Sequence, residues 1–159
     1  KEQLEKLQYN LWFEDKYKFW NNDVYYESMT VDTTTWNRHQ FVSVSSGEVI
    51  GYIAYNVVRA DHRANALSII NFSDNKMVFG KDLMCSLRDI FEKYKFNKLS
   101  FSVVIGNPIE KSYDKMIKKY GGRIVGTCKA DVKLIDGEYY DRKLYEILSE
   151  EYFEAIKTQ

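Results

Sequence analysis

The sequence predicts a single α/β domain built on a mixed β-sheet, and three observations support this prediction. Residues 41–58 form a β-branched and aromatic run that Ser-Ser-Gly-Glu interrupts, which is typical of a β-hairpin. Residues 67–103 then follow strand, helix and strand patterns in turn, which favours a parallel pair of strands around the helix. The 159 residues contain one proline and no Gly/Ser-rich linker, so we expect one domain over residues 1–159.

Two helices are expected before the first strand. Leucines recur at helical spacing from Leu4 to Leu11, and aromatic residues continue as far as Trp20. Residues 2–20 are therefore predicted to be helical, with a break near Glu14 that separates a longer helix from a shorter one.

Two later helices follow from an apolar stripe and from capping signals. Residues 80–95 carry apolar side chains on one helical face, and a second helix is expected to begin at Asn107. Asn107 suits the N-cap, Pro108 suits the first helical position, and Glu110 can close a capping box. The Gly-Gly pair at 121–122 ends this helix, because glycine accepts the left-handed cap conformation.

The remaining elements lie after the two glycines. Strands are expected near residues 123–134 and 142–148, with an Asp-Gly turn between them, and residues 149–159 are predicted to form a short helix. Up to residue 148, the predicted order is α-α-β-β-β-α-β-α-β-β, with an antiparallel sheet early and a parallel pair around the helix at residues 80–95.

Composition narrows the classes of function. The 23 basic and 23 acidic residues balance, whereas a nonspecific nucleic-acid binder carries a basic surplus, so we expect no nucleic-acid partner. Cys85 and Cys128 lie far apart and the two histidines are isolated, so no metal site is expected. We find no apolar run of membrane-spanning length and no signal-peptide pattern. These features predict a cytoplasmic protein with free thiols and no membrane partner.

The predicted order of elements resembles that of the GNAT superfamily of acyl-CoA N-acyltransferases without its first strand. The chain begins at Lys1, so we expect that strand to lie upstream of the sequence. The family's diagnostic loop has the form Gln/Arg-x-x-Gly-x-Gly/Ala, and the matching stretch here runs from Asn75 to Gly80. Only Gly80 fits this form, while Asn75 and Val78 replace the Gln/Arg and the first Gly.

In the family, the amides of this loop bind the pyrophosphate of CoA. The resemblance therefore implies a cofactor-binding segment made of Asn75, Lys76, Met77, Val78, Phe79, Gly80 and Lys81. The start of a helix offers unpaired N–H groups to an anion, and the two lysines add positive charge. Val78 is expected to hold the backbone back from the phosphates, and its replacement by glycine is expected to tighten CoA binding. An ordinary loop before a helix that docks on the sheet is the alternative interpretation.

The resemblance also assigns roles around the thioester of acetyl-CoA. It implies that a backbone N–H near Ile70, Asn71 or Phe72 polarises the thioester carbonyl. It further implies that Asn107 contacts the CoA arm and that Tyr113 protonates the departing CoA thiolate. Asn107 is equally well explained as a helix cap, and Tyr113 as a core tyrosine on the apolar face of its helix.

Two further features of the expected site are less sharply defined. Asp61, His62, His39 and Glu48 are possible general bases, although none stands in a diagnostic context. The acceptor side would be built from the aromatic residues of the N-terminal region, where a cationic amine can be received; these are Trp12, Trp20, Tyr25, Tyr26 and Trp36. For Trp12 and Trp20 we expect simple packing of the helices on the sheet.

The resemblance implies an N-acetyltransferase that moves an acetyl group from acetyl-CoA to an amine by direct attack in a ternary complex. The amine acceptor is expected to belong to a small molecule, a peptide or a protein, and a homodimer is compatible with this function. The alternative is a non-catalytic GNAT-like module that binds CoA or another protein, which the unusual residue at Val78 favours.

Overall fold

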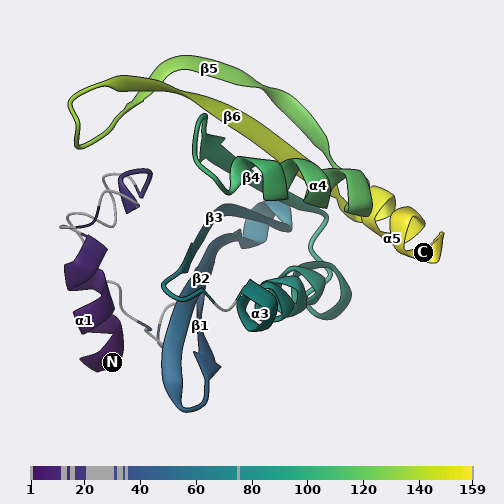
Figure 1. The fold of residues 1–159 in the computed structure, drawn as a ribbon. Helices are drawn as coiled ribbons and strands as arrows, with labels where there is room; N and C mark the ends of the chain where they lie inside the picture. The colour runs from purple at the N-terminus through teal and green to yellow at the C-terminus, as the bar shows by residue number, and fades with distance from the viewer. Residues whose placement is uncertain are drawn as a thin grey trace.

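The computed structural model describes residues 2–11, 14, 17–20, 31, 34, 36–74 and 76–158. Its six strands form one sheet in the order β1-β2-β3-β4-β6-β5 (Figure 1). Strands β3 and β4 are parallel, and every other neighbouring pair is antiparallel. The prediction of an α/β domain with a mixed sheet is confirmed, as is the parallel pair around the central helix.

The sheet begins with the predicted hairpin of β1 (Arg38–Ser45) and β2 (Glu48–Val58). Ser46 and Gly47 form its two-residue turn with φ values of 52° and 84°. Positive φ at both central residues is the geometry of a type I′ turn, whose twist matches that of the flanking strands. The sequence signal of a tight turn between two β-branched runs is therefore realised as predicted.

Strand β3 (Arg63–Asn71) starts earlier than expected and carries a β-bulge. Ala54 pairs with Ser68 and Asn56 with Asn65, so two residues of β3 lie opposite the single residue Tyr55. Ala66 adopts a left-handed conformation in this bulge, with φ of 51°. A bulge bends its strand and increases the local twist. The bend in β3 is in a position to direct the strand away from its other neighbour in the sheet, β4.

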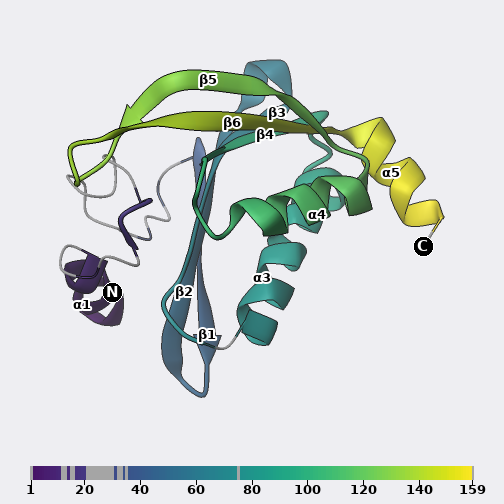
Figure 2. The same ribbon diagram turned by 45° about the horizontal axis from the view of Figure 1, so that its top comes forward.

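Three helices cover one face of the sheet. They are α3 (Lys76–Arg88), which continues into the π-helical turn η3 (Asp89–Lys93), α4 (Glu110–Tyr120) and α5 (Ser149–Lys157). Their buried side chains, among them Phe79, Ile90 and Tyr113, pack with those of the strands into the main core cluster. Helix α1 (Glu2–Leu11) lies on the opposite side of the β1–β2 hairpin (Figure 2) and packs through Leu4 and Leu11 in a second cluster.

The other half of the sheet is formed by β4 (Lys98–Val104), β5 (Arg123–Lys133) and β6 (Tyr139–Leu148). Helix α4 ends at Gly121, which has φ of 78°, and Gly122 follows where the chain passes close to β6. A Cβ atom on Gly122 would lie 2.8 Å from the carbonyl oxygen of Glu146 and 2.7 Å from Ile147 Cγ1. The predicted stop at the two glycines is confirmed, and the second glycine is required by close packing.

Two predictions about helices are wrong. Helix α1 is described as far as Leu11 and Glu14 is not helical, which agrees with the expected break, but residues 17–20 form a turn rather than a second helix, and the Trp20 backbone N–H donates to the Tyr17 carbonyl. The central helix begins at Lys76 rather than at Gly80, so residues 76–80 are helical and not part of an extended loop. The terminal helix and the last two strands lie where the sequence predicted them.

None of the helices in the described parts of the chain combines the length and the apolar character needed to cross a bilayer. Trp12, Tyr25, Tyr26 and Asn75, which the sequence singled out, lie outside the described residues.

Candidate active site

Strands β3 and β4 separate soon after they meet. Their parallel pairing is confined to Arg63 with Lys98 and Ala64 with Leu99. Both strands nevertheless continue, β3 to Asn71 and β4 to Val104. The separation begins at the β-bulge of β3, and it leaves the facing edges of two neighbouring strands without a shared ladder of hydrogen bonds.

A cavity of about 330 Å³ lies in this gap. Both strand edges line it, and further side chains come from the N-terminal segment, from the start of α4 and from β6. Its lining consists of Phe19, Trp20, Ala66, Leu67, Ser68, Ile69, Ser102, Val103, Val104, Asn107, Ile109, Tyr113 and Arg142. The structure thus brings Asn107 and Tyr113, two residues that the sequence singled out, to one cavity at the splayed strands.

The backbone of β3 presents alternate residues to this gap. The Phe72 N–H donates to the Ile50 carbonyl of β2 over 2.8 Å, so it faces away from the cavity. Because successive residues of a regular strand alternate in direction, Ile69 and Asn71, which follow the bulge, direct their backbone groups toward the gap. The Ile69 carbonyl confirms this direction, since it accepts a 3.1 Å hydrogen bond from the Trp20 indole N–H.

Trp20 has two roles at this edge. It packs against the cluster between α1 and the sheet, as the sequence predicted, and it also lines the cavity. Its bond to Ile69 joins positions 49 residues apart, so no local sequence signal could have identified it.

The first turn of α3 stands where the resemblance placed the pyrophosphate loop. Lys76 begins the helix, and its N–H donates to the Asp74 carbonyl over 2.9 Å. Val78 packs against the main core cluster, and the buried Phe79 ring lies against Gly51 of β2. The side chain of Val78 is therefore directed at the core, which removes the sequence-based argument that it stands between the backbone and a phosphate.

The outer side of this turn is open. A Cβ atom placed on Gly80 would meet no atom within 4 Å. Met77 and Lys81 are exposed on the same helix. A helix N-terminus with an open surface is suited to an anion, because the helix dipole and the amides of the first turn favour negative charge there.

Asn107 caps the turn that leads into α4. Its Oδ1 accepts the Ile109 N–H over 3.1 Å, and its carbonyl accepts the Glu110 N–H over 2.9 Å. Glu110 reaches back to the Gly106 N–H, one residue earlier than the predicted capping box required. Asn107 therefore closes the turn before the helix, whereas the helix itself has Ile109 at its N-cap and begins at Glu110, so the predicted N-cap position is wrong. Contact with a CoA arm stays a prediction.

Tyr113 is a core tyrosine that also lines the cavity. Only 3% of its surface is exposed, and burial raises the pKa of its phenol well above the ordinary value. Its ring meets Phe101 edge-on, with the centroids 5.0 Å apart. Among the residues that the structure describes, no hydrogen-bond partner of the Tyr113 hydroxyl is found. The phenol is therefore held by its ring, and its hydroxyl is left for the cavity.

A polar cluster anchors the first turns of α4 to β6. Lys143 pairs with Glu110 and, over 3.5 Å, with Asp114, and the Tyr145 hydroxyl donates to Asp114 over 2.8 Å. The hydrogen bond from Lys143 lowers the pKa of Glu110, to which the Gly106 amide contributes. The two carboxylates four residues apart are visible in the sequence, but the lysine that joins them lies on a distant strand.

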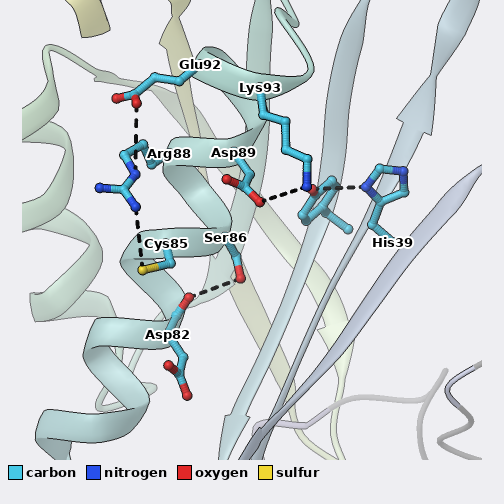
Figure 3. A network of polar contacts seen from close by, with 9 residues as sticks. His39, Asp82, Cys85, Ser86, Arg88, Asp89, Glu92 and Lys93 are labelled. Carbon is cyan, nitrogen blue, oxygen red and sulfur yellow. Dashed lines mark hydrogen bonds and ion pairs between the residues drawn. The ribbon is translucent and has the colours of Figure 1, made fainter.

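The candidate bases lie elsewhere. None of Asp61, His62, His39 and Glu48 lines the cavity. His39 faces the helix formed by α3 and η3 (Figure 3), where its Nδ1 lies 3.1 Å from the Tyr55 hydroxyl. Burial lowers the pKa of His39, and Arg59 and Lys93 lower it further. Among the described residues, no three His, Cys, Asp or Glu side chains gather closely enough to hold a metal ion.

Solved structures share this arrangement of elements. A probable acetyltransferase of the GNAT family from Chromobacterium violaceum ATCC 12472 matches with a TM-score of 0.70 and 14% sequence identity, over 94% of this chain and 84% of that chain. The chain has the GNAT acetyltransferase fold. Spermidine/spermine N-acetyltransferase SpeG from Vibrio cholerae matches this GNAT fold with a TM-score of 0.63 and 19% identity, over 76% of this chain and 71% of that chain.

The similarity is one of structure rather than sequence. Neither a protein-family model nor a curated protein sequence matches the chain. Two further acetyltransferase structures have TM-scores of 0.62 and 0.60, and the chain spans only 65% and 62% of their lengths.

Proposed function

We propose that this GNAT domain transfers an acetyl group from acetyl-CoA to an amine by direct attack in a ternary complex. The observation that carries the proposal is the cavity between the splayed strands β3 and β4, into which a strand edge and a buried phenol both face. An extended chain with amide groups can pair with an open strand edge, and the pantetheine arm of CoA is such a chain. The GNAT acetyltransferase structures with the same fold support this assignment.

The edge of β3 supplies the binding groups for this arm. The backbones of Ile69 and Asn71 face the gap, so their N–H and C=O groups can bond the two amides of the pantetheine. The Trp20 indole N–H donates to the Ile69 carbonyl. When the arm binds, Trp20 either keeps its hydrogen bond to the Ile69 carbonyl, or the arm displaces the indole and bonds to that carbonyl instead.

The pyrophosphate is assigned to the first turn of α3, which follows β3 after a short connection. Lys76 and Lys81 supply positive charge there, and the open side of Gly80 leaves room for an anion. Phosphate at a helix N-terminus is favoured by the dipole and by the amides of the first turn.

The chemical step needs a neutral amine and a leaving thiolate. The amine nitrogen attacks the thioester carbonyl carbon, and the oxygen that gains negative charge accepts a hydrogen bond from an amide of the β3 edge. When the C–S bond breaks, the Tyr113 hydroxyl donates its proton to the CoA sulfur, the amine proton leaves to water, and the Tyr113 phenolate takes a proton back from water. The phenol is protonated near neutral pH, as this donor role needs, although burial raises the pKa of Tyr113 and so makes it a weaker acid.

Calorimetry and a transfer assay test the proposal. We expect acetyl-CoA to bind, and CoA release to depend on an added amine from a panel that includes amino acids, arylalkylamines and spermidine, the amine named for the SpeG structures. No binding at millimolar acetyl-CoA would overturn the proposal. Binding without transfer to any amine would favour the non-catalytic CoA-binding module instead.

A further inference from the structure

We propose that Arg142 selects an acceptor amine that also carries a carboxylate, as an amino acid does. The inference rests on the proposed acetyl transfer and adds the chemical class of the acceptor. Arg142 lies on β6 and lines the cavity at the splayed strands. A guanidinium is the side chain best suited to a carboxylate, because its planar N–H groups match the two oxygens.

The cavity has two chemically different sides. Along β4, Phe101 and Val103 belong to the core cluster beneath α4, and Ser102 points to the opposite face of the sheet. Tyr113 stands on the helical side with Phe101, whereas Arg142 stands on the other side with Ser102. The leaving sulfur is assigned to the side of Tyr113, so the acceptor has to approach the thioester carbonyl from the side of Arg142.

Arg142 is held in place without using all its donors. Its Nε donates to Asp131 over 2.6 Å, and its Nη1 donates to the Ser102 hydroxyl over 3.4 Å. Within the described part of the chain, no hydrogen bond or ion pair engages its Nη2. Two fixed nitrogens orient the guanidinium, and the third nitrogen is left for a ligand, with the Ser102 hydroxyl beside it.

A bulge in β5 produces this orientation. Cys128 pairs with Arg142 and Val132 with Tyr140, so three residues of β5 lie opposite Asp141 alone. The Asp141 carboxylate accepts the Ala130 N–H over 2.9 Å and thereby closes the bulge. Asp131 follows in the same bulge and reaches Arg142, so local backbone geometry sets the direction of the arginine.

The charge of the lining favours an anionic group over a second cation. Arg142 is the only lining residue, among those described, that carries a formal charge near neutral pH, and its Asp131 partner, outside the lining, offsets part of this charge. A polyamine would bring further positive charge to this arginine without meeting a carboxylate of the described lining. Charge of like sign within a cavity disfavours a ligand, whereas a carboxylate gains a charge-assisted hydrogen bond.

Matched acceptors test the assignment. We expect acetyl transfer to phenylalanine and lysine to exceed transfer to phenethylamine and cadaverine, which differ only by the missing carboxylate. In Arg142→Gln, we expect kcat/KM to fall about tenfold to hundredfold for the two amino acids, as the loss of a hydrogen bond to a charged group implies, and to change little for the two amines. Arg142→Lys should keep part of the preference, because it keeps the charge but not the planar fork.

Controls separate recognition from stability. Lys133→Gln removes a basic side chain from the same hairpin, where the Lys133 ammonium lies 5.7 Å from the centre of the Tyr139 ring and away from the cavity lining, and it should leave the preference unchanged. The Kd for acetyl-CoA and the thermal unfolding midpoint of each variant report on the fold. An equal loss of activity on all four acceptors in Arg142→Gln would show a structural role and overturn the assignment.

Product binding keeps this test independent of catalysis. Calorimetry should show that N-acetylphenylalanine binds the wild-type chain more tightly than N-acetylphenethylamine does, and that Arg142→Gln removes this difference. Equal binding of the two products by the wild-type chain would overturn the role of Arg142, whether or not transfer occurs. Failure to bind acetyl-CoA overturns the proposed transfer, and preferred transfer to spermidine, phenethylamine or cadaverine overturns the acceptor class alone.

Discussion

The rings of Tyr113 and Tyr145 meet edge to face, with their centroids 5.9 Å apart and their planes at 79°. The Tyr145 hydroxyl is bound to Asp114, so Tyr145 is fixed at both its ring and its oxygen. Tyr113 is fixed by ring contacts alone, since it also lies edge-on to Phe101. The two tyrosines of one cluster thus differ in their hydroxyls, because the Tyr145 hydroxyl is bonded to Asp114 and no partner of the Tyr113 hydroxyl is found among the described residues.

Replacing Tyr113 by phenylalanine should therefore separate chemistry from packing. We expect kcat for acetyl transfer to fall about 100-fold or more, as the loss of a general acid implies, with the Kd for acetyl-CoA nearly unchanged. Stability should hardly change, because no hydrogen bond within the described chain is lost. Tyr120→Phe, on the same helix, is the matched control. Undiminished turnover in Tyr113→Phe would exclude the phenol as the acid.

Gly80→Ala tests the position of the pyrophosphate. The helix gains a better helix former at a site where a Cβ meets nothing within 4 Å, so the free energy of unfolding should rise. Replacement of a helical glycine by alanine is worth about 0.5–1 kcal/mol. We expect acetyl-CoA to bind more weakly to this more stable protein, because the new methyl group occupies the open side of the turn. Unchanged affinity, measured by calorimetry, would place the phosphates elsewhere.

Val78→Gly should weaken the fold without tightening the binding of acetyl-CoA. The valine packs against the core cluster, and its loss removes buried apolar surface and adds a flexible residue to a helix. We expect the free energy of unfolding to drop by about 1–3 kcal/mol. Denaturant titration and calorimetry together check this result. Tighter binding in the variant would restore the sequence-based view that the side chain obstructs the phosphates.

Much of the fold was readable because its signals are local. The turn at Ser46 and Gly47 and the stop at Gly121 are backbone requirements that the sequence states directly. The sequence misplaces the start of α3 because Gly80 resembles the last residue of a loop, whereas the structure accommodates this glycine within the helix. Glycine signals a boundary only where φ or close packing requires it, and neither applies to Gly80.

The site was only partly readable because it is assembled from distant segments. Asn107 and Tyr113 were found through the capping pattern and the family resemblance. Trp20 reaches β3 and Arg142 reaches β4 across the sheet, and such contacts between strands have no signature in a single sequence. The separation of β3 from β4 begins at the bulge that contains Ala66. This alanine has a left-handed conformation, and no turn signal in the sequence indicates it.

The anchor of α4 should give the fold a measurable dependence on pH. The pKa of Glu110 is lowered from its ordinary value of 4.5, chiefly by the hydrogen bond from Lys143. A carboxylate with a depressed pKa in the folded state stabilises the fold above its unfolded pKa, and this contribution is lost as the pH falls through the folded pKa. Glu110→Gln should therefore reduce the loss of stability below about pH 4.5.

Denaturant titrations between pH 7 and pH 3 measure this difference. Lys143→Gln should flatten the same part of the profile, because it removes the partner that lowers the pKa of Glu110. Glu154→Gln, which replaces an exposed carboxylate on α5, is the control. A profile of Glu110→Gln parallel to that of the wild type would show that the pair does not contribute to the stability of the folded state.

The packing of α3 on the sheet requires that residue 51 be a glycine without a side chain. A Cβ atom there would overlap the Phe79 ring and lie 2.9 Å from the Ile70 carbonyl oxygen, so Gly51→Ala has to displace the first turn of the helix. We expect a loss of about 1–3 kcal/mol in the free energy of unfolding, together with weaker binding of acetyl-CoA. Gly126→Ala, in a strand position with no atom within 4 Å of the added Cβ, is the control. Phe79→Leu in the Gly51→Ala background should recover part of the stability, and strict additivity of the two changes would show that the ring and the glycine are not coupled.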